Sequence, residues 1–132
     1  AVSRVRVASS RCFCSLWQHP SRISSRRMLR HIVCLKFKAS LDKVQTSAAL
    51  SAALKTLPAK IPEIKGYLFG ADAGLDPEKN HDFVIVADFA DLAAYKKYST
   101  HPEHMEVVVQ VIKPVIADGG RVAVQCYFPS SL

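Results

Sequence analysis

The sequence predicts an α+β fold in which a four-stranded antiparallel sheet carries helices on one face. Two observations lead to this class. Some stretches place apolar residues at every second position, as half-buried strands do, and others place them at every third or fourth position, as helices do. Along the chain these stretches follow the order βαββαβ. With 132 residues, the chain is most simply one domain with a core of its own.

The first strand is expected at His31–Lys38 (HIVCLKFK), because apolar residues alternate there. One face collects His31, Val33, Leu35 and Phe37. A helix is expected next, capped by Ser40 or Asp42 and running to about Leu57, where Pro58 and Pro62 end it. Its apolar positions are Val44, Ala48, Leu50, Leu54 and Leu57.

The second half of the chain supplies three strands and two helical segments. Strands are expected at Glu63–Gly74, which has glycine breaks, and at Asp82–Phe89, which is apolar on both faces. Asp91 can cap a short helix that carries Leu92, Tyr95 and Tyr98. A longer helix is expected with apolar residues from Met105 to Ile116, and a last strand at Gly119–Phe128.

The apolar strands also predict a homodimer. Two helices cover only one face of such a sheet, yet the strand at Asp82–Phe89 is apolar on both. The open face would exceed the few hundred Å² that monomers usually expose. A second copy packed sheet to sheet covers it, so we expect an isologous homodimer through the sheet face.

The net charge of +7 comes from the amino-terminal segment. Of the 18 lysines and arginines, seven arginines lie within residues 1–30, which hold no acid, so the body balances its basic residues with all 11 acids. A neutral body does not present the basic surface of a nucleic-acid-binding protein. The strand Asp82–Phe89 also lacks the aromatic pattern of RNA-recognition modules, which share the βαββαβ order. We therefore expect no nucleic-acid partner.

Residues 1–30 form a basic leader that we expect to lie outside the folded domain. The leader is rich in arginine and serine, which is the composition of an organelle-import presequence. Alternatively, Met28 is the true initiator and the residues before it are read-through of an untranslated region. The first interpretation places the protein in mitochondria or plastids, and the second in the cytoplasm. The domain is expected at residues 31–128, followed by a short tail at residues 129–132.

The remaining composition points to neither a metal protein nor a membrane protein. None of the four cysteines has C-x-x-C spacing, and Cys34 and Cys126 fall in strand-like stretches where we expect buried apolar roles. His101 and His104 could meet a metal, but no cysteine or well-placed carboxylate completes a site. No apolar run reaches the ~18 residues of a membrane span. We expect no metal, no cofactor and no membrane partner.

The stretch YSTHPEH (Tyr98–His104) allows two interpretations. In the structural one, Thr100 and Glu103 form a capping box, Pro102 occupies the first turn of a helix, and His104 is an interior imidazole bonded to a backbone carbonyl. In the functional one, Tyr98 and His104 converge around the Pro102 bend. There the imidazole removes a proton while the phenol polarises a carbonyl.

Four stretches together resemble the stress-responsive dimeric α/β barrel (Dabb) family over roughly His31–Phe128. They are HIVCLKFK, LPAKIPEIKGYLFG, DFVIVADFADLAAYKKYSTHPEH and VIKPVIADGGRVAV. The resemblance implies a ferredoxin-like subunit whose sheet closes a barrel with its twin. The family includes plant stress proteins without assigned chemistry, and olivetolic acid cyclase, which closes a linear polyketide by aldol condensation.

The resemblance also implies roles for individual residues. Tyr98 and His104 match the working pair of the cyclase, and His31 matches a histidine of its pocket. Phe83 stands where the cyclase has a further pocket histidine, and His81 lies two residues earlier. Our candidates are therefore Tyr98 and His104 as catalytic residues.

The candidate binding residues are His31, Phe83 and His101. The expected function is a small-molecule-binding or protective homodimer whose ligand is small and apolar or phenolic. The alternative is a cofactor-free polyketide cyclase or lyase.

Overall fold

The structure is a computed structural model that describes residues 27–130. Most of the basic leader, on which the expected location in the cell depends, lies outside the described residues, as do residues 131–132. No helix among the described residues is long and apolar enough to cross a membrane.

Four antiparallel strands form one sheet in the order β2-β3-β1-β4. The strands are β1 (Arg27–Phe37), β2 (Ile64–Ala71), β3 (Phe83–Phe89) and β4 (Ile116–Pro129). The predicted α+β class and four-stranded antiparallel sheet are confirmed. The first and last strands of the described residues lie side by side, because β1 pairs with β4 along most of its length.

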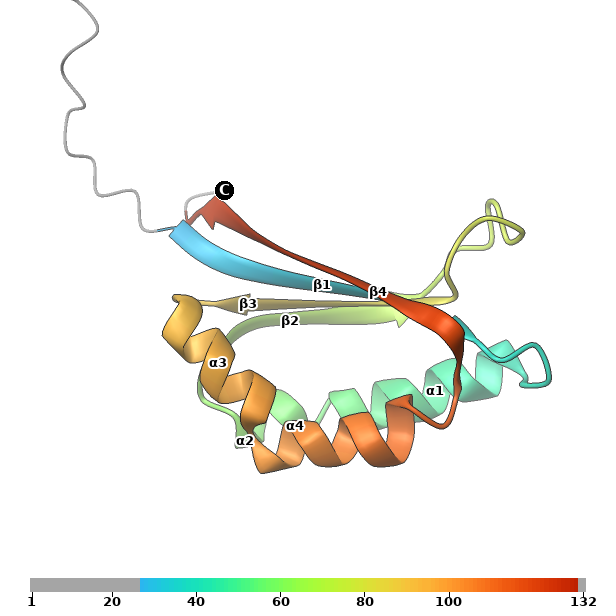
Figure 1. The fold of residues 1–132 in the computed structure, drawn as a ribbon, viewed down its shortest axis with the longest axis horizontal. Helices are drawn as coiled ribbons and strands as arrows, with labels where there is room; N and C mark the ends of the chain where they lie inside the picture. Colours follow the sequence, from blue (N-terminus) through green and yellow to red (C-terminus); the bar gives the residue numbers. More distant parts are fainter. Residues whose placement is uncertain (1–26, 131–132) are drawn as a thin grey trace, which may run out of the picture.

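All the helical segments lie on one side of this sheet, and the opposite face carries no helix among the described residues (Figure 1). They are α1 (Lys43–Leu54), α2 (Leu57–Lys60), α3 (Leu92–Thr100), α4 (Pro102–Val107) and the π-helix η1 (Val108–Ile112). One face of the sheet is therefore covered by the chain's own helices, as the sequence predicts.

Two predicted helix caps are present. The Asp42 carboxylate accepts a hydrogen bond from the N–H of Gln45 (2.8 Å) at the start of α1, and Asp91 accepts one from Ala94 (2.8 Å) at the start of α3. These side chains satisfy backbone N–H groups that have no partner within the helix. The helix after Asp42 ends at Leu54 rather than Leu57, because Leu57 begins a separate short helix, α2, with Pro58 in its first turn.

The first strand begins earlier than expected. The sequence predicts a leader at residues 1–30, but β1 starts at Arg27, and Leu29 is buried in the core. The reason is the length of β4, whose last residues pair with the beginning of β1 as far as Pro129. Arg30 is fixed in the sheet by an ion pair with Asp88 (2.7 Å).

The region from Met105 to Ile116, expected as one long helix, instead contains parts of three elements. The α-helix α4 ends at Val107, η1 makes one π-helical turn, and β4 already begins at Ile116. The N–H of Lys113 donates to the carbonyl of Val108 (2.9 Å), five residues earlier, which is the π-helical pattern. Apolar periodicity does not separate this turn from a regular helix.

The core lies between the inner face of the sheet and the helices. Alternate β1 residues point into it, giving the alternating burial predicted for this strand. The fully buried side chains include Leu35, Leu50, Leu54, Leu57, Ile61, Phe83 and Phe89. Five residues expected on apolar helix faces are exposed instead, namely Val44 (79% exposed), Ala48, Leu92, Met105 and Val109.

Candidate functional site

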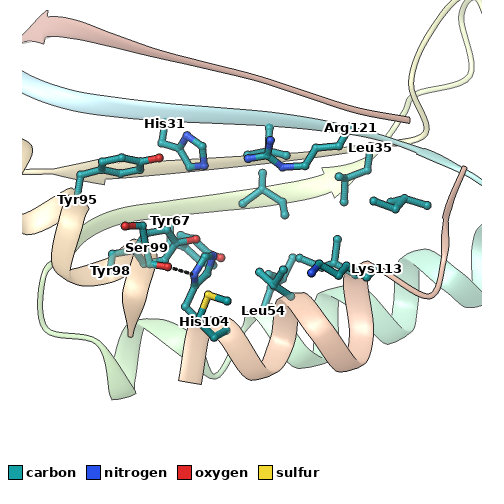
Figure 2. A pocket seen from close by; sticks show the side chains of 16 residues that line it. His31, Leu35, Leu54, Tyr67, Tyr95, Tyr98, Ser99, His104, Lys113 and Arg121 are labelled. Carbon is teal, nitrogen blue, oxygen red and sulfur yellow. Dashed lines mark hydrogen bonds between the residues drawn. The ribbon is translucent and has the colours of Figure 1, made fainter. Parts of the chain in front are cut away.

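A cavity of about 350 Å³ lies between the sheet and the helices. Sixteen residues line it, drawn from all four strands, from α1, α3, α4 and η1, and from the turn before β4 (Figure 2). Its aliphatic lining residues are Val33, Leu35, Leu54, Ile85, Val108, Ile112 and Ile116. Polar groups gather around His31, Tyr98 and His104, so the cavity has an apolar body and a polar end (Figure 2).

A bend between α3 and α4 brings Tyr98 and His104 together. The residue before a proline avoids the helical region, and His101, just before Pro102, is extended (φ −64°, ψ 134°). Helix α3 therefore stops and α4 restarts at an angle. The rings of Tyr98 and His104 lie with their centroids 4.2 Å apart, as the functional interpretation of YSTHPEH requires.

The end of α3 also fixes the tautomer of His104. The last carbonyls of a helix have no partner within it, and the carbonyl of Ser99 lies 3.3 Å from Nδ1 of His104. Because a carbonyl only accepts, this bond places the proton on Nδ1 and leaves Nε2 with a free lone pair. Burial lowers the pKa of His104 from its ordinary value, with Arg121 contributing, so the ring is a neutral base at pH 7.

The predicted capping box is wrong, although the predicted bond from His104 to a backbone carbonyl is present. The first N–H groups of α4 are capped by His101, whose Nδ1 accepts from the N–H of Glu103 (3.2 Å). Thr100 is still part of α3, and its hydroxyl donates to the carbonyl of Lys96 (3.1 Å). Glu103 instead pairs with Lys60 (2.7 Å). The extended conformation of His101 moves the cap one residue further along.

His31 occupies the sheet side of the cavity and is only 5% exposed. Its Nδ1 lies 2.7 Å from the side-chain nitrogen of Gln125 on β4, and its ring lies beside Tyr95 (centroids 5.2 Å apart). Because an amide nitrogen donates, Nδ1 accepts and the proton resides on Nε2. Burial, together with the charge of Arg121, lowers the pKa of His31 to about 4, so this ring is also neutral at pH 7.

Two phenols complete the polar end. Burial raises the pKa of Tyr98 and the pKa of Tyr67, which lies on β2, above their ordinary values. The neighbouring Tyr98 raises the pKa of Tyr67 further. Both therefore stay protonated and remain hydrogen-bond donors at neutral pH. The hydroxyl of Tyr67 is buried and has no hydrogen-bond partner among the described residues.

The structure brings three of the five predicted site residues to one cavity. His31, Tyr98 and His104 line it, whereas Phe83 packs against Phe37 in the core (ring centroids 6.3 Å apart) and does not line it. His101 is outside it as well and caps α4. The structure therefore gives Phe83 and His101 no direct part in this site, and the binding roles of both stay sequence predictions.

Sequence reasoning missed several polar residues of the site. Tyr67, Tyr95 and Arg121 line the cavity, and Gln125 fixes His31. The alternation of β4 offered a signal, because Arg121 and Gln125 share the strand face opposite to Val122 and Val124. Among residues 27–130, no three histidine, cysteine or acidic side chains are grouped so that they could hold a metal ion.

Comparisons with known proteins agree with this architecture. Residues 29–126 match the stress responsive A/B barrel domain (Dabb). A dimeric ferredoxin-like protein of unknown function from Thermobifida fusca is 37% identical, with a TM-score of 0.68 over 77% of this chain and 92% of that chain. A dimeric protein of unknown function from Bacteroides fragilis is 26% identical, with a TM-score of 0.66 over 76% of this chain and 96% of that one.

A third similar structure is an enzyme. The hydroxynitrile lyase of Passiflora edulis is 19% identical, with a TM-score of 0.67 over 81% of this chain and 98% of that chain. At this identity the likeness concerns the fold. No curated protein matches the sequence. The domain match over residues 29–126 and the 37% identical Thermobifida fusca protein establish that the chain belongs to the stress responsive A/B barrel (Dabb) family.

Proposed function

We propose that this protein binds a small, largely apolar molecule in the cavity beneath its sheet. The observation that carries the proposal is the convergence of Tyr98 and His104 on one cavity of about 350 Å³. This volume falls within the roughly 300–1,000 Å³ of small-molecule sites, which are typically apolar with a few convergent polar groups. A binding or protective role requires nothing beyond this arrangement.

The proposal includes a homodimer. The open face of the sheet carries Leu68 (69% exposed) and Val124 (53% exposed), with Val122, Val84 and Ile32 beside them. Proteins rarely leave such a continuous apolar face in water. Two of the similar structures are described as dimeric. A second copy packed on this face would cover it and leave the cavity within each subunit.

Ligand binding can be tested by NMR on the full chain. We expect 4-hydroxyacetophenone, a neutral aryl ketone with a phenol, to shift the amide signals around Tyr98 and His104. Val108→Phe fills the cavity and should weaken binding. Val109→Phe is the matched control, because Val109 is the next residue, is exposed and does not line the cavity. Absence of binding at millimolar concentration, or equal binding by the Val108→Phe protein, would contradict the proposal.

A second candidate function is proton-transfer catalysis, of the kind used by a cofactor-free cyclase or lyase. It is favoured by the hydrogen bond from His104 to Ser99, which leaves Nε2 unprotonated. This nitrogen would take a proton from the carbon beside a ketone while the electron pair moves onto the carbonyl oxygen. Tyr98 would donate a hydrogen bond to the resulting enolate. The Passiflora edulis enzyme is a lyase, but its likeness to this chain extends to the fold alone.

This candidate has a direct readout. In D₂O, the full chain should exchange the α-protons of acetophenone faster than buffer does, and His104→Gln should abolish the difference. The variant Tyr98→Phe should reduce the rate by less, because it removes only the hydrogen bond to the enolate. If the protein binds the ketone but exchange proceeds at the buffer rate, the catalytic function is contradicted and the passive binding function stands.

The location in the cell is likewise a proposal, resting on the composition of the leader. An import presequence predicts that the mature protein begins near the start of β1, whereas initiation at Met28 predicts a chain that never carried the leader. Amino-terminal sequencing of the protein from isolated organelles and from cytosol distinguishes the two. Recovery of the uncleaved leader in the cytosol would contradict both.

A further inference from the structure

The lining of the cavity has an unbalanced charge. Its charged side chains are Arg121 and Lys113, and none of the sixteen residues is an acid. The pKa values of His31 and His104 are both lowered, so the two imidazoles are neutral at pH 7. They neither add to the positive charge of Arg121 and Lys113 nor offset it. The cavity is therefore a largely apolar space whose charged lining residues, both of them exposed, are all positive.

Arg121 is the cation that lies nearest to the polar end. Successive residues of a strand point to opposite faces of the sheet. Because Val122 on β4 points to the open face, the side chain of Arg121 points to the face covered by the helices. Figure 2 shows its guanidinium extending beside His31. It pairs with no acid among the described residues, whereas Arg30 is paired with Asp88 and Lys60 with Glu103. Arg121 is exposed at the edge of the cavity, and the described part of the chain supplies no acid to pair with it, so an anion bound in the cavity could take that place.

Tyr67 provides an independent observation. Its hydroxyl lies at the cavity wall, is buried, and has no hydrogen-bond partner among the described residues. An unsatisfied buried hydroxyl costs about 1–3 kcal/mol, so such groups usually have a partner. With Tyr98, Arg121 and Nε2–H of His31, the cavity presents an excess of hydrogen-bond donors over acceptors. The complementary ligand is rich in acceptor oxygens.

We propose that the ligand is an amphipathic carboxylate, with its carboxylate on Arg121 and its apolar body against Leu54, Ile85 and Ile112. The planar guanidinium matches the two oxygens of a carboxylate with paired N–H groups. The aliphatic lining fits an alkyl or aryl body. This inference rests on the proposed ligand-binding function and adds the chemical class of the ligand and the residue that selects it.

A matched pair of probes tests the carboxylate separately from binding itself. 4-Phenylbutanoate and 4-phenylbutanamide have the same apolar body and nearly the same shape but differ in charge. We expect calorimetric titration of the full chain to show at least about tenfold tighter binding of the carboxylate, the effect of one charge-assisted hydrogen-bonded pair.

Three variants locate the source of the preference. Arg121→Gln should abolish the preference by weakening the carboxylate alone, and Arg121→Lys should retain part of it because the charge remains without the planar fork. Lys97→Gln removes the same charge from an exposed position on α3 that does not line the cavity, and should leave the preference intact. Arg121 is itself exposed, so its substitution should not unfold the protein.

The possible failures are distinguishable. If the wild-type chain binds both probes equally, the carboxylate inference is wrong and the binding function stands. If the preference survives in Arg121→Gln but falls in Lys97→Gln, it comes from the general surface charge, and the assignment to Arg121 is wrong. If neither probe binds and 4-hydroxyacetophenone also fails, the proposed function and this inference are both overturned.

Discussion

The two faces of the sheet differ in how much of their apolar surface is covered by the described part of the chain. On the inner face, alternate residues such as Val33 and Ile85 are buried beneath helices, and the polar groups among them surround a cavity. On the outer face, Leu68, Val122 and Val124 are equally apolar but remain exposed. Apolar residues on both faces of the strands thus form a buried core on one side of the sheet and an exposed apolar surface on the other.

This difference gives the two faces different properties. On the inner face, buried side chains contact one another and share hydrogen bonds around the cavity. On the outer face, the cost of leaving apolar side chains in water favours association with a second copy. Predictions about the inner face concern stability and protonation, while those about the outer face concern association.

The largest expected effect is on the outer face. Val124→Asp would place an uncompensated carboxylate in the proposed dimer interface, once per subunit, and burying an unpaired charge costs about 3–5 kcal/mol. We expect dimers to become monomers in sedimentation equilibrium. Val109→Asp introduces the same charge on an exposed position of η1 and should leave the dimer intact. A Val124→Asp protein that remains dimeric would show that the subunits do not meet through this face.

A pair of leucine substitutions compares the faces directly. Leu29→Ala removes a buried inner side chain, and we expect it to lower the free energy of unfolding by about 2–5 kcal/mol at any protein concentration. Leu68→Ala on the outer face should cost less, and its cost should rise with protein concentration as dimers form. Urea unfolding at two concentrations measures both. A negligible cost at Leu29 would restore the leader boundary that we first expected at residue 30.

Protonation should destabilise the inner face. His31 has a pKa of about 4 in the folded protein, below its ordinary value of about 6.5, so the unfolded chain binds a proton that the folded one does not. Stability is fully present above about pH 6.5 and should fall by a few kcal/mol as the pH drops towards 4. Unfolding curves across this range measure the slope, which His31→Gln should reduce. An unchanged slope in that variant would mean that His31 is not the group responsible.

His104 should contribute to stability as well as to the site. His104→Ala removes the hydrogen bond to Ser99 and the contact with the ring of Tyr98, so we expect a loss of about 1–3 kcal/mol. His81→Ala, in the loop before β3 and away from this cavity, is the comparison and should cost less. Equal melting temperatures for wild type and His104→Ala would show that the imidazole is kept for ligand chemistry alone.

The smallest expected effect is at Tyr67. Because its hydroxyl has no partner among the described residues, Tyr67→Phe should leave the melting temperature of the ligand-free protein unchanged or raise it slightly. Tyr127→Phe, at an exposed position, is the control for loss of a phenol. A clear destabilisation by Tyr67→Phe would mean that the hydroxyl has a partner within the protein, and would weaken the argument for a donor-rich cavity.

The sequence by itself determined the local structure and part of the site. The residue pattern predicted all four strands. The capping role of Asp91, and Asp42 as one of two candidate caps, followed from their positions before helical periods. The approach of Tyr98 and His104 was predictable too, because Pro102 forces a bend between them. These features depend on interactions among residues close in sequence, so the amino-acid sequence alone is enough to predict them.

Tertiary structure decided the rest. Tyr67 and Arg121 reach the cavity only because β2 and β4 pair in a particular register with β3 and β1. Phe83 lies in the core rather than in the cavity, and the start of β1 at Arg27 depends on β4 being long enough to pair with it. Such contacts join residues far apart in the chain, and neither propensity nor spacing encodes them. The sequence therefore determined which elements form, and their packing determined which side chains meet in the cavity.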